Sequence, residues 1–62
     1  MANQIKKTLM ERDGLTATEA KEEMNYVREM MEDAIANGDY FEAEEIFEEE
    51  FGLELDYIFD LF

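Results

Sequence analysis

The sequence predicts an all-α protein, a compact bundle of three to four short helices, on four observations. The 62 residues contain no proline, and apolar side chains recur at spacings of three and four residues, the period of an α-helix. The three glycines, Gly14, Gly38 and Gly52, fall where these periodic segments end. No window alternates apolar and polar residues for more than four positions, so strands are not expected.

The first predicted helix covers residues 3–12, where Ile5 and Leu9 lie one helical turn apart. Gly14 is expected to end this segment in a left-handed conformation, because glycine has no Cβ to oppose it. The apolar Leu15 that follows is then expected to fold back on the last turn of the helix. The sequence around Gly14 therefore predicts where the first helix ends.

The second predicted helix covers residues 17–36 and has the strongest apolar periodicity in the chain. It begins with a capping box, in which Thr16 and Glu19 satisfy each other's backbone N–H groups. Its apolar residues recur over five turns and predict one buried stripe: Ala20, Met24, Val27, Met31, Ala34 and Ile35.

The third predicted helix begins after Asp39, which serves as its N-cap, and ends at Gly52. Glu42 lies three residues after Asp39, so a second capping box is expected there. The residues predicted to share the buried face of this helix are Tyr40, Ala43, Ile46, Phe47 and Phe51.

The tail, residues 55–62, is apolar on nearly every side when drawn as a helix and lacks a good N-cap. A helix of this kind needs burial on several sides, and a small monomer offers little cover. One interpretation is that the tail closes the core and also forms a dimer interface. The other is that it packs inside a monomeric bundle. The residues assigned to the oligomer interface are Tyr57, Ile58, Phe59 and Phe62.

The length predicts one domain, residues 1–62, with a core that is marginal at this size. Cysteine is absent, so no disulfide can staple the fold, yet 47% of the residues are apolar. We therefore expect a folded domain that gains stability from a homodimer or another partner. Neither a secretory signal nor a membrane-spanning stretch is visible, which predicts a cytoplasmic protein with no membrane partner.

All of the net charge lies in the second half of the chain. Residues 1–28 contain five basic and five acidic side chains, whereas residues 29–62 contain thirteen acidic side chains and no basic one. This asymmetry produces the whole net charge of −13. Such a field repels nucleic acid and anionic membranes and attracts basic surfaces, so a basic protein is the expected partner.

The residue types needed for common catalysis are missing. Histidine and cysteine are both absent, which removes the commonest general base and the best nucleophile. No glycine is flanked by the ligands of an EF-hand loop, so a dedicated calcium site is not expected either. We therefore predict a protein that is not an enzyme and uses no cofactor and no metal.

Two predicted helices turn carboxylates outward. In residues 48–50 three glutamates occupy the last helical turn, where the helix dipole favours cations. This arrangement reduces stability, which suggests a role in binding. The alternative is a solvated face for solubility, although a net charge of magnitude ~2–8 would suffice for that. The residues assigned to partner binding are Glu29, Glu32, Asp33, Glu45, Glu48 and Glu49.

The segments RDGLTATEA (residues 12–20) and NGDYFEAEEIFEEEFGLELDYIFDLF (residues 37–62) resemble those of short acidic proteins from phages and mobile elements. In size, charge and helical character the chain is similar to anti-CRISPR and anti-restriction proteins that imitate DNA. This resemblance implies an inhibitor that occupies the nucleic-acid-binding groove of a host defence complex, in the host cytoplasm. The alternative function is a small homo-oligomeric structural or regulatory module that uses its C-terminal aromatic helix.

Overall fold

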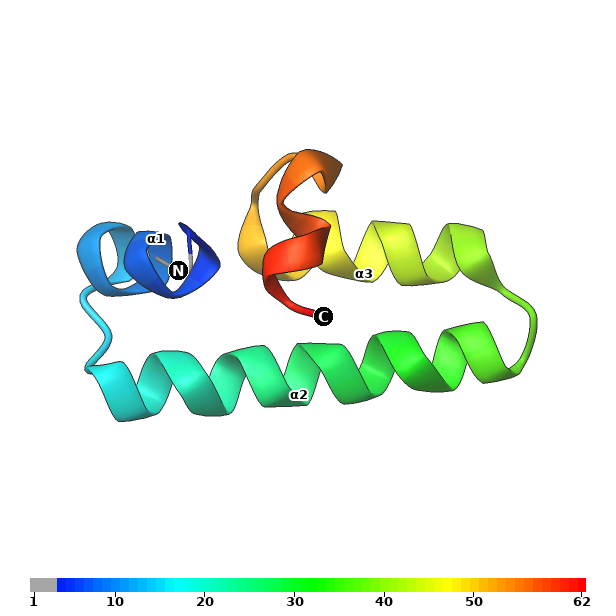
Figure 1. Ribbon diagram of the computed structural model, residues 1–62, viewed down its shortest axis with the longest axis horizontal. Coiled ribbons are helices and arrows are strands. Elements are labelled where there is room, and N and C mark those ends of the chain that lie inside the picture. Colours follow the sequence, from blue (N-terminus) through cyan, green and yellow to red (C-terminus); the bar gives the residue numbers. More distant parts are fainter. Residues whose placement is uncertain (1–3) are drawn as a thin grey trace.

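The computed structural model describes residues 4–62, and this part of the chain folds into four helical segments without a strand. Their order is α1 (Gln4–Asp13), α2 (Ala17–Ala36), α3 (Tyr40–Phe51) and a 3₁₀-helix, η1 (Leu55–Asp60) (Figure 1). The molecule measures 33 × 21 × 20 Å. The predicted all-α class is confirmed, and the second helix has the predicted bounds. The predicted first helix began at residue 3, which lies outside the described residues.

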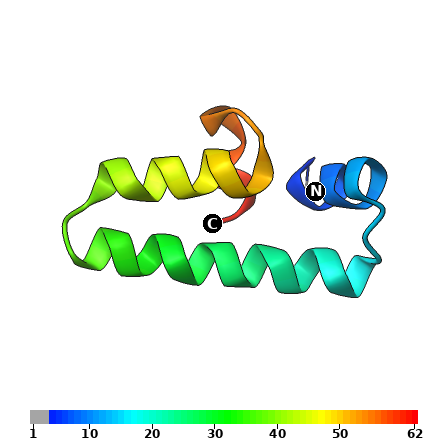
Figure 2. The same ribbon diagram turned by 180° about the vertical axis from the view of Figure 1, so that it is seen from behind.

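Helix α2 forms one layer of the molecule, and α1 and α3 lie over its two ends in a second layer. Figure 2 shows α3 running antiparallel to the C-terminal half of α2, with α1 beside the N-terminal half. The short η1 segment lies where α1 and α3 meet, and it contacts both of them. The acidic second half of the chain thus occupies α3, η1 and one end of α2.

The connection between α1 and α2 has the predicted geometry. Gly14 has a φ of 71°, and the N–H of Leu15 donates to the carbonyl of Leu9 at 3.3 Å. The Oγ1 of Thr16 accepts from the N–H of Glu19 at 3.1 Å, and the Thr16 N–H donates to Glu19 Oε1 at 2.9 Å. The expected capping box is therefore confirmed.

The connection between α2 and α3 differs from the prediction in one bond. Asp39 Oδ1 accepts from the N–H of Glu42 at 3.0 Å, as an N-cap should. The Asp39 N–H, however, donates to the carbonyl of Ala34 at 2.9 Å instead of to the Glu42 side chain. The tight turn brings the Asp39 amide over the last turn of α2, so a backbone carbonyl takes the place of the carboxylate.

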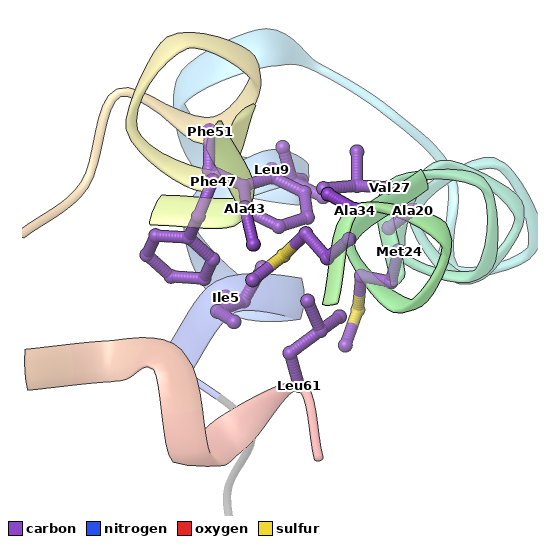
Figure 3. Close-up of a cluster of buried hydrophobic side chains, with 11 residues drawn as sticks. Ile5, Leu9, Ala20, Met24, Val27, Ala34, Ala43, Phe47, Phe51 and Leu61 are labelled. Carbon is purple, nitrogen blue, oxygen red and sulfur yellow. The ribbon is translucent and has the colours of Figure 1, made fainter. Parts of the chain in front are cut away.

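The core is built from residues of α1, α2 and α3 and from Leu61, which directly follows η1 (Figure 3). The rings of Phe47 and Phe51 are fully buried and meet edge to face, with centroids 5.2 Å apart and planes at 78°. No polar or charged side chain is buried among residues 4–62. The buried residues are Ile5, Leu9, Ala20, Met24, Val27, Met31, Ala34, Ala43, Phe47, Phe51 and Leu61.

Two residues predicted on buried faces are exposed at the end of the molecule where α2 turns into α3. Ile35 is 38% exposed and Tyr40 is 63% exposed, whereas the rest of each predicted stripe is buried or half-buried. The reason is that η1 lies at the C-terminal end of α3, beside α1, and leaves the opposite end, near this turn, open (Figure 1).

The tail forms a 3₁₀-helix, and its three-residue period determines which side chains reach the core. A 3₁₀-helix aligns residues i, i+3 and i+6, so Leu55, Ile58 and Leu61 fall on one side. Leu61 is buried, and Leu55 and Ile58 are partly buried against the core. Phe59 is 85% exposed. The tail therefore closes the core on one side, which both interpretations of the sequence include, and dimerisation stays a prediction.

Two polar contacts hold the tail against the helices. Asp60 Oδ2 accepts from the backbone N–H of Gln4 at 3.1 Å, at the N-terminal turn of α1, where a helix dipole favours an anion. The half-buried Arg28 donates from Nη1 to the carbonyl of Leu61 at 3.4 Å and from Nη2 to Asn25 Oδ1. These bonds connect the C-terminal segment to both α1 and α2.

Candidate protein-binding surface

All six carboxylates assigned to partner binding are exposed, three on α2 and three on α3. Residues 4–62 provide none of them with an ion-pair partner. In each set one or two carboxylates point directly away from the buried stripe, whereas Glu32 and Glu48 lie nearer to its edge, at about 100° per residue. The described structure therefore leaves these charges free to meet another molecule: Glu29, Glu32, Asp33, Glu45, Glu48 and Glu49.

The structure does not join the two sets into one face. Glu29 lies two residues from both Val27 and Met31, and so points away from the core, at about 100° per residue. Glu45 has the same relation to Ala43 and Phe47 on α3. Since both buried stripes face the same core, Glu29 and Glu45 point in opposite directions. The acidic region therefore consists of two surfaces, one on each layer.

A cation lies near the acidic C-terminal end of α3. Arg12 of α1 donates to both carboxylate oxygens of Asp13, at 2.9 and 3.1 Å. This hydrogen bond holds the pKa of Asp13 below its usual range and raises the pKa of Arg12. A methyl group on Gly52, the C-cap of α3, would lie 3.2 Å from Arg12 Nη1. The guanidinium thus sits beside the negative end of the α3 dipole.

An apolar groove opens between the α2–α3 turn and η1, with a volume of about 350 Å³. Tyr40 and Phe59 expose most of their rings there, and Glu44 contributes the charged side chain of the lining. The lining residues are Met31, Ile35, Tyr40, Ala43, Glu44, Leu55, Ile58 and Phe59.

The groove contains part of the interface predicted for the tail. Ile58 and Phe59 line it, whereas Tyr57, which is 36% exposed, and Phe62, which is 57% exposed, lie outside it. Sequence reasoning missed the groove because it placed Ile35 and Tyr40 in the core. The available signal was an excess of large apolar residues on both sides of the α2–α3 turn, more than a two-helix contact can bury.

Two other features, a metal-ligand cluster and a membrane-spanning helix, are absent from the part of the chain that the structure describes. Across residues 4–62, no three ligating side chains gather closely enough to hold a metal ion. In the same range, no helix combines the length and apolar character needed to cross a lipid bilayer.

No family model, curated protein or solved structure matches the chain.

Proposed function

We propose that this protein is a non-enzymatic, protein-binding inhibitor of the phage anti-defence type, which acts in the host cytoplasm. Its outward carboxylates imitate nucleic acid and occupy the basic groove of a nucleic-acid-binding protein or complex. One observation carries the proposal: residues 29–62 contain thirteen acidic side chains and no basic one, and the six partner-binding candidates are exposed.

The energetics of α3 support this proposal. Neighbouring carboxylates three or four residues apart repel each other by a few tenths of a kcal/mol per pair. The glutamates at positions 48–50 also face the unfavourable end of the helix dipole, at ~0.3–1 kcal/mol each. A 62-residue chain has little stability to lose, so a gain on binding is the physical reason to keep these charges.

The two-surface geometry sharpens the proposal. A carboxylate array on one helix can follow one phosphate strand, whereas the array on the other helix faces away from it. We therefore assign the primary contact to Glu45, Glu48 and Glu49, which lie on the helix with the denser charge, and a separate contact to the α2 set. Association is expected to be fast and to weaken as salt rises.

The test is a competition assay with the full chain. The protein is added to a purified, sequence-independent DNA-binding protein that holds a fluorescent DNA duplex, and release is followed by anisotropy. We expect release at low salt that weakens steeply between about 20 mM and about 200 mM salt. Failure to release DNA even in the dilute buffer contradicts the proposal.

Matched variants distinguish binding through a specific surface from a general effect of net charge. The double variant Glu45→Lys/Glu49→Lys is expected to weaken competition at least about tenfold, the loss of ~1.4 kcal/mol. The control Glu11→Lys/Glu22→Lys changes the net charge equally, at exposed positions in the neutral half. Equal losses in both doubles would mean that net charge alone causes the effect.

A second function is favoured by the exposure of Phe59 (85%) and Phe62 (57%). In this alternative the C-terminal segment joins copies of the chain into a homo-oligomeric structural or regulatory module. Deleting the tail would expose the core through loss of Leu61, so substitution is the better test. Sedimentation equilibrium of wild type and Phe59→Ser/Phe62→Ser should show association that only the wild type retains.

A further inference from the structure

The apolar groove exposes large side chains that the fold does not use. Tyr40 of α3 and Phe59 of η1 both line a hollow, and its buried lining residues, Met31 and Ala43, form the floor. The floor residues are buried, so the groove leads directly to the core. An exposed, contiguous apolar patch bounded by polar residues is typical of a binding site.

The rim of this groove is anionic. Glu44 lines it directly. Glu48 lies one helical turn further along α3, and Glu32 lies one turn before Ile35 on α2, so both exposed carboxylates neighbour lining residues. Both helical walls at this end belong to the half of the chain that lacks any basic residue. The groove thus combines an apolar floor with negative charge on both helical walls.

Charge complementarity identifies the occupant. A second copy of the chain would bring another net charge of −13 against the same rim, and like charges at an interface oppose association. An anionic lipid surface or nucleic acid is repelled for the same reason. A neutral apolar compound would fill the floor but leave the rim unused. A polypeptide that carries both apolar and basic side chains satisfies both parts of the groove.

We propose that the groove binds an amphipathic basic segment of the partner protein. A Leu, Met or Phe side chain of that segment enters between Tyr40 and Phe59, and flanking Lys or Arg residues meet Glu32, Glu44 and Glu48. This inference rests on the proposed function, since it assumes a basic partner. It adds an apolar anchor that a pure imitation of phosphate would lack, and such anchors dominate many interfaces.

The experiment compares two synthetic helical peptides of equal positive charge. One presents Leu and Phe at helical spacing between its lysines, and the other has Ala and Gln at those positions. Binding of each to the full chain is measured by isothermal titration calorimetry at about 150 mM salt, where exposed charges are partly screened. We expect the amphipathic peptide to bind at least about tenfold more tightly.

Two matched variants test whether the groove causes the tighter binding of the amphipathic peptide. Tyr40→Ser/Phe59→Ser removes the two exposed rings of the groove and is expected to abolish the preference. Tyr26→Ser/Phe41→Ser removes a Tyr and a Phe that are also exposed, at 56% and 71%, but do not line the groove. This control is expected to keep the preference. An equal loss in both variants would overturn the assignment, and circular dichroism checks that both variants stay folded.

The remaining outcomes separate the two proposals. Equal affinity for both peptides overturns the groove inference and leaves the acidic-surface function standing. No binding of either peptide even at about 20 mM salt contradicts both. Sedimentation that shows a dimer, dissociated by Tyr40→Ser/Phe59→Ser alone, would mean that a second copy fills the groove, and the inference would be wrong. Tight binding of an uncharged Leu-Phe peptide would overturn the role of the rim.

Discussion

Helix α3 and the C-terminal segment, residues 55–62, are both rich in aromatic residues, but they place them very differently. In α3, Phe47 and Phe51 are completely buried and pack edge to face. Within η1 no residue is fully buried, and Phe59 is 85% exposed. The two regions differ in spacing rather than in composition. Residues four apart on an α-helix share a face, whereas consecutive apolar residues point to every side.

This difference indicates two roles for aromatic residues in one small chain. Phe47 and Phe51 hold the two layers together, whereas Tyr40 and Phe59, which line the groove, remain exposed beside neighbours that do reach the core. Leu61 and Ile58 anchor the segment that carries Phe59. The core therefore holds the exposed rings in place without burying them, which is the arrangement expected of a binding surface.

The largest expected effect is the loss of a buried ring of α3. Phe47→Ala should lower the free energy of unfolding by ~3–5 kcal/mol, because it removes apolar contacts and leaves a cavity. A 62-residue domain has a total of only ~3–9 kcal/mol at ~0.05–0.15 kcal/mol per residue. Thermal unfolding followed by circular dichroism should therefore show a very low midpoint or no cooperative transition.

The matched substitution in the C-terminal segment is Phe59→Ala. Since the Phe59 ring is 85% exposed, the free energy of unfolding should change by less than ~0.5 kcal/mol. A loss comparable to that of Phe47→Ala would show that Phe59 is buried in solution, for example in a dimer. That result would remove the contrast between the two regions.

An intermediate effect is expected at Gly52, which joins these regions. Its φ of 63° is costly for residues with a Cβ, at ~1–2 kcal/mol, and a Cβ would also lie 3.2 Å from Arg12 Nη1. Gly14 is the matched control, because its φ is 71° and a Cβ there meets nothing within 4 Å. Chemical denaturation should show that Gly52→Ala destabilises more than Gly14→Ala. The extra cost should disappear in an Arg12→Ala background, and its persistence would mean that Arg12 does not contact the cap.

Most of the fold could be predicted because local signals coincide with the elements. The capping box of Thr16, the left-handed glycines and the stripe of α2 each depend on a few neighbouring residues. The burial of Leu61 and the exposure of Tyr40 could not be predicted in this way. Both depend on where η1 lies against α1 and α3, which is a tertiary property. The burial of Leu61 also depends on the 3₁₀ period, because the same residues show no single apolar face when drawn at 3.6 residues per turn.

For the candidate site, too, local features could be predicted from the sequence and tertiary features could not. Exposure of the acidic residues follows from their positions outside the apolar stripes, so their exposure could be predicted from the sequence. Their separation onto two surfaces could not be predicted from either helix alone. It follows from the packing of α2 against α3, which turns Glu29 and Glu45 in opposite directions. The groove likewise exists only because three segments converge.

A smaller effect than that at Gly52 is expected from the charge of α3, the feature in which this helix departs most from a stable helix. Glu49→Lys places a cation in the last turn and should raise the free energy of unfolding by ~0.3–1 kcal/mol. The control Glu42→Lys makes the same charge change in the first turn, where the dipole favours an anion. Both variants relieve repulsion between carboxylates, so the difference between them isolates the dipole. Denaturation in dilute buffer should place Glu49→Lys above Glu42→Lys, and about 1 M salt should bring the two together because it screens exposed charges. If Glu49→Lys were less stable than Glu42→Lys, or if salt left the difference between them unchanged, the glutamates at this end would carry no electrostatic cost. Binding would then not be needed to explain why α3 has them.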